Sequence, residues 1–419
     1  MTSWLVPRSW LSPEQARAVE LSPERHRVIA GTPGSGKTQV LLHRAAWLRA
    51  NYRVRTDGLR VFTFTNLLKS YIASALPVLG LPPSCVSTFD RWCCDTYRRV
   101  VRRPLPAVVE DGEARPDFRA IRLSVLRWAR GLERREKLFH FVMVDEGQDL
   151  DADSFEILQL VAHHVTVGID FRQQIYDRVV REDELLARLG LASGEVAFLP
   201  SFRCCPWVAR VAGRFLDDPF ERAAWLAELR AEQSEKELPL LFVARSADQE
   251  RERLVEILRA RTLRHEQVFV LLPRRRQVGA WAEFLATRRI EVEVYPDLDF
   301  ASVRPKLIAY HSAKGLSADV VLMPGLTAAA FDKFNAALQC RLLYVGITRA
   351  RRWAYLSTID SGAGVFPPLE RLLHPAAAEI CTVQRSARAR AGSPLAEITD
   401  ADLERDLFDF SSTDPLSLL

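Results

Sequence analysis

The sequence lacks several features that would place a protein in a specialised class. No apolar run approaches the roughly 20 residues of a membrane-spanning helix, so no membrane segment is expected. Residues 1–10 have no basic start followed by an apolar core, so no secretory signal is predicted. None of the seven cysteines forms a CxxC pair, which argues against a zinc or iron–sulfur site. These absences favour a cytoplasmic protein with small buried thiols in a reducing compartment.

The chain also has little net charge. Its 58 Lys and Arg against 53 Asp and Glu give +5, which is too little to predict nucleic-acid binding by itself. The excess is concentrated in residues 90–137, which hold 13 basic and 8 acidic side chains. A basic stretch of this kind suits contact with phosphates, although a solvated helical face is the commoner explanation.

With 419 residues, of which 48% are hydrophobic, the chain is long enough for two or three domains. Short aliphatic and β-branched runs alternate with helical stretches, a pattern typical of parallel sheets that are covered on both faces. The runs are 28–30, 61–64, 141–144 and 165–168, and then 240–243, 268–272, 306–310 and 319–323. We therefore predict an α/β protein with two parallel-sheet domains, residues 1–199 and 200–382.

The last part of the chain, residues 383–419, differs in composition. Residues 383–394 are polar and basic and are typical of a linker. Beyond them, apolar residues recur at near-helical spacing among acidic ones. This acidic-hydrophobic tail is either a short helix packed on the core or a docking peptide for a protein partner.

One segment matches the phosphate-binding pattern GxxxxGK[ST] after a predicted strand and before a predicted helix. It consists of Gly31, Thr32, Pro33, Gly34, Ser35, Gly36, Lys37 and Thr38. The glycines let backbone N–H groups converge on phosphate oxygens at a helix N-terminus. Lys37 would reach the β and γ phosphates, and Thr38 would hold Mg²⁺. The segment predicts a site for a nucleoside triphosphate such as ATP.

Two carboxylates follow the predicted strand 141–144. Asp145 is placed to ligate Mg²⁺ through the water shell of the metal, and Glu146 to polarise an attacking water. An isolated Asp-Glu pair at a strand end is more often structural. Together with the phosphate-binding segment, the pair is more consistent with catalysis.

These motifs stand in an ordered series that resembles superfamily 1 helicases of the UvrD/Rep/PcrA type over roughly residues 11–356. The similar segments are 11–15 (LSPEQ), 63–66 (TFTN), 87–89 (STF), 145–149 (DEGQD), 170–176 (DFRQQIY), 201–203 (SFR), 311–316 (HSAKGL) and 344–350 (YVGITRA). The resemblance implies two RecA-like domains with ATP bound in the cleft between them.

The resemblance also implies which residues contact the nucleotide. Gln15 would recognise adenine, Phe202 would cover the face of the base, and Gly315 would lie at the nucleotide. Gln39 stands where relatives often place an Arg against adenine, which puts base selectivity in doubt. Phe202 is equally consistent with a core position.

Three further residues would act on the γ-phosphate by the same resemblance. Gln173 would sense it from the first domain, and Arg203 and Arg349 would meet it from the second domain as arginine fingers. Because such fingers act only when the domains close, hydrolysis would be coupled to domain motion. An internal ion pair is the alternative role for Arg203.

Single-strand binding needs aromatic platforms beside a groove that follows the backbone. The resemblance implies stacking by Phe64, Phe89 and Tyr176, with Thr65, Asn66, Thr88 and His311 as polar neighbours. An isolated Phe after a strand is usually a core residue, so that alternative stays open for each ring.

The sequence departs from the family at several points. Asp177-Arg178 follows Tyr176 in place of a basic residue and a stacking Trp, Ser317 replaces a Glu, and Leu338-Gln339 replaces an acidic pair. Only 55 residues separate Phe89 from Asp145, where relatives insert an accessory domain. We therefore expect residues 90–137 to be a reduced basic insert beside the strand channel, and the second, duplex-engaging insert to be absent.

Two functions are consistent with these features. The first is an ATP-dependent motor on single-stranded or partly duplex DNA, an ATPase and translocase with 3′-to-5′ helicase polarity implied by resemblance alone. The second is an ATPase sensor that controls a partner nuclease or anti-phage defence effector without processive unwinding. RNA as the track stays open, because backbone and stacking contacts tolerate either sugar.

Overall fold

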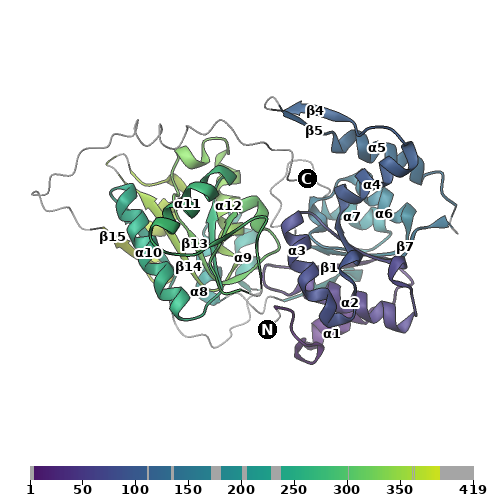
Figure 1. Cartoon of the computed structure of the whole chain (residues 1–419). Coiled ribbons are helices and arrows are strands. Elements are labelled where there is room, and N and C mark those ends of the chain that lie inside the picture. The colour runs from purple at the N-terminus through teal and green to yellow at the C-terminus, as the bar shows by residue number, and fades with distance from the viewer. Residues whose placement is uncertain are drawn as a thin grey trace, which may run out of the picture.

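The computed structural model of the chain describes residues 4–110, 113–133, 136–170, 181–200, 205–227, 237–300, 302–360, 362 and 364–386. It has two lobes, each built on one parallel sheet with helices on both faces (Figure 1). The predicted α/β class with two parallel-sheet units is confirmed.

The sheet of the first lobe has six strands in the order β3-β2-β6-β7-β1-β8. The strands are β1 (Arg27–Gly31), β2 (Leu59–Thr63), β3 (Val86–Thr88), β6 (Phe139–Val144), β7 (Ala162–Ile169) and β8 (Ala197–Leu199). Successive residues of a strand enter different cores: Met143 of β6 packs in one, and Val142 and Val144 pack in the other. This double burial explains the nearly continuous apolar runs in the sequence.

The helices of the first lobe divide between the two faces of this sheet. One face is covered by α1 (Pro13–Val19), α2 (Lys37–Asn51) and α3 (Asn66–Ala75). The other is covered by α4 (Phe89–Val101), α5 (Phe118–Ala129), α6 (Ala152–Val161) and α7 (Glu182–Leu189). Parallel strands joined by helices bring the loops after the strands to one edge, which is where ligands bind in such sheets.

The sheet of the second lobe has seven strands in the order β11-β12-β10-β13-β14-β9-β15. The strands are β9 (Leu240–Ala244), β10 (Val268–Leu272), β11 (Glu293–Val294), β12 (Lys306–Ala309), β13 (Ala318–Met323), β14 (Ala350–Ile359) and β15 (Thr382–Arg385). Its helices are α8 (Pro206–Gly213), α9 (Pro219–Ala227), α12 (Ala336–Ile347) and α13 (Glu370–Leu373) on one face, and α10 (Ala247–Leu263) and α11 (Arg275–Thr287) on the other.

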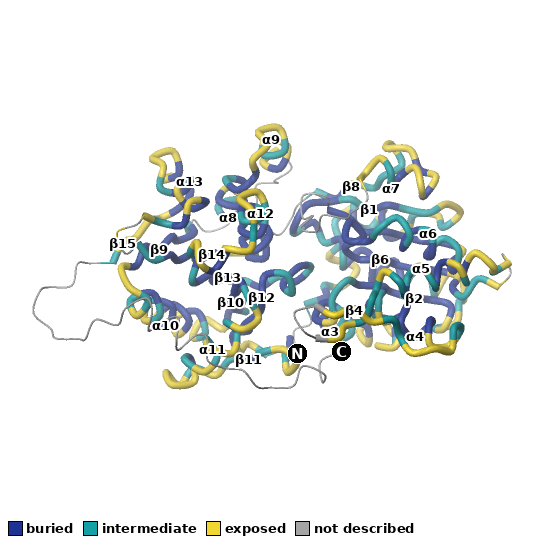
Figure 2. The backbone as a smooth tube through the Cα atoms, turned by 90° about the horizontal axis from the view of Figure 1, so that it is seen from above, coloured by how far each residue is buried: buried dark blue, intermediate teal, exposed yellow. Residues whose placement is uncertain are grey.

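The lobes share part of their hydrophobic core. One cluster of buried side chains continues from the first lobe into the second, and Tyr71 of α3 meets Phe300 edge to face at 4.8 Å. Figure 2 shows the buried segments running through the middle of both lobes. The six cysteines in the described ranges are buried as free thiols, as the sequence predicted.

Two boundaries differ from the prediction. The linker does not begin at residue 383, because residues 382–385 form β15, which pairs with β9 at the edge of the second sheet. All four residues of β15 are exposed, so this edge strand lacks the apolar alternation that would have revealed it. In the first lobe, α4 and α5 of the predicted insert bury one face in the core, and β4 (Ala107–Glu110) and β5 (Glu113–Pro116) form a separate two-stranded sheet.

Within the described ranges, no helix is long and apolar enough to cross a membrane.

Candidate active site

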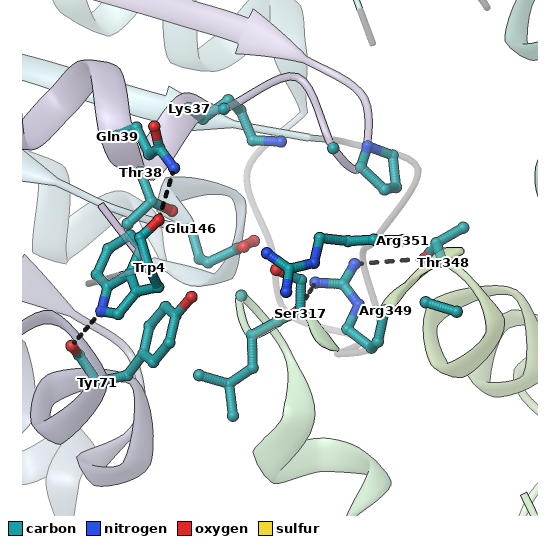
Figure 3. A pocket seen from close by; sticks show the side chains of 16 residues that line it. Trp4, Lys37, Thr38, Gln39, Tyr71, Glu146, Ser317, Thr348, Arg349 and Arg351 are labelled. Atoms are coloured by element: carbon teal, nitrogen blue, oxygen red, sulfur yellow. Dashed lines mark hydrogen bonds between the residues drawn. The ribbon is translucent and has the colours of Figure 1, made fainter. Parts of the chain in front are cut away.

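A cleft opens between the lobes, beside the carboxyl ends of β1 and β6. The first lobe lines it with loop residues 33–38 and Glu146, and the second lobe with residues 315–317 and 348–351 (Figure 3). Segments that lie far apart in the sequence therefore meet in one cavity, and most of them belong to motifs that the sequence singled out.

The loop 31–38 connects β1 to α2 in the way that a phosphate-binding loop requires. Gly34 and Gly36 have φ angles of 82° and 83°, a left-handed conformation that favours glycine. The side-chain hydroxyls of Thr32 and Ser35 are buried and have no hydrogen-bond partner in the described part of the chain. Since α2 begins directly after Gly36, its N-terminal N–H groups add a positive partial charge. The loop fits an anion such as a triphosphate.

The ammonium group of Lys37 lies inside this loop. Its Nζ donates to the carbonyl oxygens of Gly31 at 2.7 Å and Thr32 at 3.3 Å, and it lies 3.8 Å from a carboxylate oxygen of Asp170. The side chain is only 7% exposed. A positive charge is therefore fixed at the floor of the cleft.

The side-chain amide of Gln15 is bonded to backbone groups at both of its ends. Its Oε1 accepts from the backbone N–H of Ser12 at 3.0 Å, and its Nε2 donates to the carbonyl of Ser35 at 2.8 Å. A Cβ atom at Gly36 would lie 2.5 Å from that Nε2, so the amide packs directly beneath the loop. Gln15 does not line the cleft. The contact of Gln15 with adenine stays a prediction, and in this structure the side chain supports the loop 31–38.

Thr38 and Asp145 lie together, as predicted for a magnesium site. The Thr38 hydroxyl donates to Oδ2 of Asp145 at 2.8 Å, while Oδ1 of Asp145 is buried with no partner in the described ranges. Burial, and then the neighbouring Glu146 carboxylate, raise the pKa of Asp145 above its ordinary value. A buried carboxylate and a hydroxyl are oxygen ligands of the kind that Mg²⁺ prefers, so these residues fit that ion.

Glu146 is held in an unusual backbone conformation at the end of β6. Its φ of 55° is left-handed, which is uncommon for a residue other than glycine, and such conformations concentrate at functional sites. Gln148 donates to its carboxylate. Burial alone would raise the pKa of Glu146, but the cations Lys314, Lys37 and Arg349 hold it below its ordinary value. Glu146 is therefore ionised and able to accept a proton or orient a water.

The second lobe brings cations to this carboxylate. Lys314 bonds Oδ1 of Asp149 across the cleft at 2.6 Å, and both side chains are almost fully buried. Arg349 donates from Nε to the carbonyl of Val345 at 3.0 Å and from Nη1 to that of Leu316 at 3.3 Å. These bonds fix the guanidinium at the wall of the cavity.

The two lobes also approach each other closely at Gly315. Its φ of 77° requires glycine, and a Cβ atom there would lie 2.9 Å from Leu68 of α3 and 3.4 Å from Oε1 of Glu146. The segment after β12 therefore lies close to both α3 and Glu146 of the first lobe. Gly315 lines the cleft, and its contact with a nucleotide stays a prediction.

Four of the predicted nucleic-acid contacts lie where a strand is followed by a helix. The Thr65 hydroxyl caps α3 by accepting from the N–H of Leu68 at 3.1 Å, and the Thr88 hydroxyl caps α4 by accepting from the N–H of Arg91 at 3.2 Å. Asn66 is exposed and Phe64 is half-buried at the end of β2. Both caps also fix the carboxyl edge of the sheet.

The other predicted contacts differ in exposure. Phe89 is 2% exposed and packs against Phe62 and Trp92, so its role as a stacking platform is corrected to that of a core residue. His311 is half-buried beside Phe334, with ring centroids 5.8 Å apart. Burial, and then the charge of Arg275, lower the pKa of His311.

The basic stretch 90–137 is divided between two edges of the first sheet. Arg122 of α5 pairs with Asp90 at 2.7 Å and with Asp151 at 3.3 Å, both near the carboxyl ends of strands. Arg99 instead lines a surface pocket with Phe139, which begins β6. The C-terminal end of α4 therefore lies at the amino edge, away from the predicted strand channel.

Four predicted site residues, Gln173, Tyr176, Phe202 and Arg203, lie outside the described residues. Two contributions to the cleft were missed by the sequence analysis. One is the ion pair Lys314–Asp149, whose members sit in two recognised motifs but were not paired. The other is the stacked pair Trp4 and Tyr71, which belongs to no motif.

Comparison with known families agrees with this arrangement. Residues 11–121 match the model of the UvrD/REP helicase N-terminal domain, and residues 307–357 match that of the UvrD-like helicase C-terminal domain. The two matches fall in the first and second lobe, respectively. The predicted resemblance to helicases of the UvrD/Rep type is confirmed.

Individual relatives match only part of this chain and at moderate sequence identity. The chain is 27% identical over 242 residues to a protein named probable DNA helicase from Mycoplasma pneumoniae, covering 53% of this chain and 44% of that one. It is 36% identical over 99 residues to the ATP-dependent DNA helicase PcrA of Bacillus subtilis, covering 23% and 13%. The chain thus spans less than half the length of either relative.

Among solved structures, the C-terminal domain of a possible DNA helicase from Lactobacillus plantarum aligns with a TM-score of 0.35 and 16% identity, covering 44% of this chain and 98% of that domain.

Proposed function

Because the chain carries matches to both the N-terminal and C-terminal domains of UvrD-like helicases, we propose that it hydrolyses ATP between its lobes to move along single-stranded DNA. One observation carries the proposal. The carboxylate of Glu146, on the first lobe, shares a cavity with Arg349 of the second and with the loop that holds Lys37. ATP hydrolysis in such a cavity would require the two lobes to be close together, so hydrolysis would be coupled to movement of the lobes.

Each group has a distinct role in the proposed reaction. The N–H groups of loop 31–38 and Lys37 bind the phosphates, and Thr38 with Asp145 would hold Mg²⁺, which neutralises developing phosphate charge when bound. Glu146 orients the attacking water and accepts its proton. Arg349 stabilises the charge that develops on the γ-phosphate as the lobes close.

The nucleic-acid track would cross the carboxyl edges of the sheets. Asn66 is exposed and His311 half-buried at the ends of β2 and β12, one in each lobe. A strand that contacts both would be pulled as the lobes open and close. The 3′-to-5′ direction rests on the family resemblance alone.

ATP hydrolysis measured with single-stranded DNA, duplex DNA and single-stranded RNA tests the proposal. We expect stimulation by single-stranded DNA, and its loss in Glu146→Gln. Direction is tested by displacement of streptavidin from strands that carry biotin at one end: faster release from the 5′ end supports 3′-to-5′ movement. Hydrolysis that no nucleic acid stimulates would contradict the motor.

A second candidate is an ATPase subunit that regulates a partner nuclease or defence effector. The observation that favours it is that α4 and α5 belong to the core of the first lobe, while the strands β4 and β5 form a separate small sheet. The proposed partner contact is the acidic-hydrophobic tail after residue 394. ATPase activity that single strands stimulate, without unwinding of a partly duplex substrate by the purified chain, would support this candidate.

A further inference from the structure

A second pocket opens at the edge of the first sheet that is opposite to the nucleotide cleft. It is lined by residues at the start of β2 and β6, by Ser87 of the edge strand β3, and by one face of α4 from Trp92 to Arg99. We call it the amino-edge pocket. The groups proposed for ATP hydrolysis lie at the carboxyl ends of the strands, so the amino-edge pocket is a separate site.

The floor of the amino-edge pocket is apolar. Trp92 is 8% exposed and Phe139 is 4% exposed, and their ring centroids lie 6.1 Å apart. Leu138, which precedes Phe139 in the sequence, is half-buried and also lines the pocket. A concave apolar surface of this kind favours a large apolar or aromatic side chain of a ligand.

One wall of the pocket carries a positive charge that is not neutralised. The guanidinium of Arg60 lies over the ring of Phe139, 5.4 Å from its centroid, and one of its N–H groups donates to the carbonyl of Ser84 at 2.7 Å. Burial lowers the pKa of Arg60, and the residue forms no ion pair with another described residue. A partly buried cation without a counter-charge is unfavourable. A carboxylate at the mouth of the pocket would offset this charge.

The acidic residues in the pocket are already paired with other cations. Asp57 forms an ion pair with Arg55 at 2.8 Å. Asp95 forms ion pairs with Arg91 and Arg98, each at 3.1 Å. These two carboxylates therefore do not cancel the positive charge of the remaining arginines.

The rim of the pocket is also positively charged. Arg99 lines the pocket, and Arg102 and Arg103 follow it at the end of α4. All three side chains are exposed, and none forms an ion pair with another described residue. An apolar floor beside a cationic rim fits a peptide in which a large apolar side chain stands next to carboxylates.

The chain itself contains a segment with this chemistry. Residues 395–419 hold seven acidic residues and one basic residue, and Phe408 and Phe410 stand on either side of Asp409. The described part of the chain ends at residue 386, 22 residues before Phe408. A chain of that length spans up to about 70 Å when extended, so the tail can reach beyond the lobe that carries it.

We propose that the acidic tail of this chain, residues 395–419, docks on the amino-edge pocket. An aromatic ring of the tail packs against Trp92 and Phe139, and its carboxylates lie beside the arginines at the end of α4. Because the pocket is separate from the nucleotide cleft, the proposal does not rest on ATP hydrolysis. A partner protein that binds the tail would leave the pocket open.

Photocross-linking of the full chain tests this docking. Benzoylphenylalanine in place of Phe408 forms a covalent bond on illumination with whatever lies against it, and mass spectrometry identifies the linked peptide. We expect links to the peptides that contain Trp92 or Phe139. The same group in place of Phe220, which is 86% exposed on α9, should not link to those peptides.

A mixture with an isotopically labelled copy shows whether the tail docks on its own chain or on a neighbouring copy. Links to the amino-edge pocket within one chain or between copies both support the proposal, because the occupant is the same segment. Links from position 408 that are confined to the second lobe, or an absence of links to the first lobe, would overturn it.

The contribution of charge is tested by changing Arg99, Arg102 and Arg103 together to Gln. These side chains are exposed, so the fold should be retained, and circular dichroism melting checks this. Docking, measured as the yield of the cross-link at low salt, should weaken about tenfold, the combined effect expected of three exposed ion pairs. Lys at the same three positions should restore the yield, because the charge is kept.

The matched variant changes three other exposed arginines of the first lobe to Gln, none of which lines the pocket: Arg17, Arg25 and Arg53. It should keep the wild-type yield. An equal loss of yield in the two Gln variants would mean that only the net charge matters, and this would overturn the proposal. Weaker single-strand binding by the Arg99, Arg102 and Arg103 variant, with an unchanged yield of the cross-link, would instead assign these arginines to the DNA track.

Discussion

On the first lobe's side, the cleft and the buried residues beside it carry the carboxylates Asp145, Glu146 and Asp149, whereas the second lobe contributes Lys314, Arg349 and Arg351. Lys37 is the cation of the first lobe at this surface. The two halves of the site are therefore unlike in charge, although both lobes are parallel sheets covered by helices.

This difference makes each lobe depend on the other. A buried carboxylate without a counter-charge is strongly unfavourable, and Lys314 at 2.6 Å provides one for Asp149 only while the lobes are close. Lys314 and Arg349, together with Lys37 of the first lobe, hold the pKa of Glu146 below its ordinary value. In the proposed reaction, closing the cleft would bring Glu146 and the cations together, which would couple hydrolysis to movement of the lobes.

The largest effect on ATP hydrolysis is expected from substitutions of Lys37 and Glu146 in the first lobe. Lys37→Ala and Glu146→Gln should each abolish ATP hydrolysis, but by different routes. Lys37→Ala removes a charge that binds phosphate, so ATP affinity should also fall. Glu146→Gln keeps the volume of the side chain and removes only the proton acceptor, so ATP should still bind. Steady-state hydrolysis and calorimetric titration with ATP measure both properties.

Glu283→Gln, on the outer helix α11 of the second lobe, is the control for the change from carboxylate to amide. It should hydrolyse ATP at the wild-type rate. Near-normal hydrolysis by Glu146→Gln would instead show that another group accepts the proton.

Substitution of Arg349, a cation of the second lobe, should affect turnover much more than ATP affinity. Arg349→Ala should lower turnover by about a thousandfold, as for an arginine finger, with a much smaller effect on ATP affinity. The reason is that Arg349 would act on charge that develops during the reaction. The measurement is kcat together with nucleotide affinity, and Arg352→Ala, at a 62% exposed side chain on β14, is the matched control. Equal losses in turnover and affinity would indicate binding of the ground state.

The parts of this site that the sequence predicted are those set by local pattern. Loop 31–38 has its glycines where a strand must turn into a helix, so its position follows from neighbouring residues. Asp145 and Glu146 were predicted because they end a recognisable strand. In each case a few consecutive residues determine the geometry.

The parts that were not predicted depend on contacts between distant segments. Trp4 meets Tyr71 across 67 residues, and Gln15 bonds Ser35 across 20. Phe89 follows a strand as a surface platform would, but the neighbouring Phe62 and Trp92 enclose it. Nothing in the local sequence distinguishes these outcomes, because burial is decided by which helices pack on the sheet.

The buried ion pair between the lobes should affect stability, and because Lys314 also holds the pKa of Glu146 down, its loss should lower turnover as well. Lys314→Met leaves Asp149 buried without its partner and should lower the free energy of unfolding by about 3 kcal/mol. Urea denaturation followed by circular dichroism measures the loss. Lys333→Met, at an exposed position of the same lobe, should have almost no effect. Equal stabilities of the two variants would mean that the pair is not formed in solution.

The smallest expected effect concerns the contrast between the two edges of the first sheet. Arg91 and Arg119 are exposed in the first turns of α4 and α5, near the carboxyl edge where Arg122 meets Asp90 and Asp151. The C-terminal end of α4, with Arg99, lies at the amino edge instead. Single-stranded DNA that crosses the carboxyl edge should therefore contact Arg91 and Arg119. It should not contact the basic residues at the C-terminal end of α4.

Changing Arg91 and Arg119 together to Gln should weaken single-strand binding and flatten the dependence of log affinity on log salt, by about 0.7 for each phosphate that the protein no longer neutralises. The matched variant changes Arg99, Arg102 and Arg103 to Gln, and it should leave affinity and slope unchanged. Fluorescence anisotropy with a labelled oligonucleotide at several salt concentrations measures both. A flatter salt dependence in the Arg99, Arg102 and Arg103 variant alone would place the DNA at the amino edge. The reason is that DNA releases counterions only from phosphates that contact charged side chains.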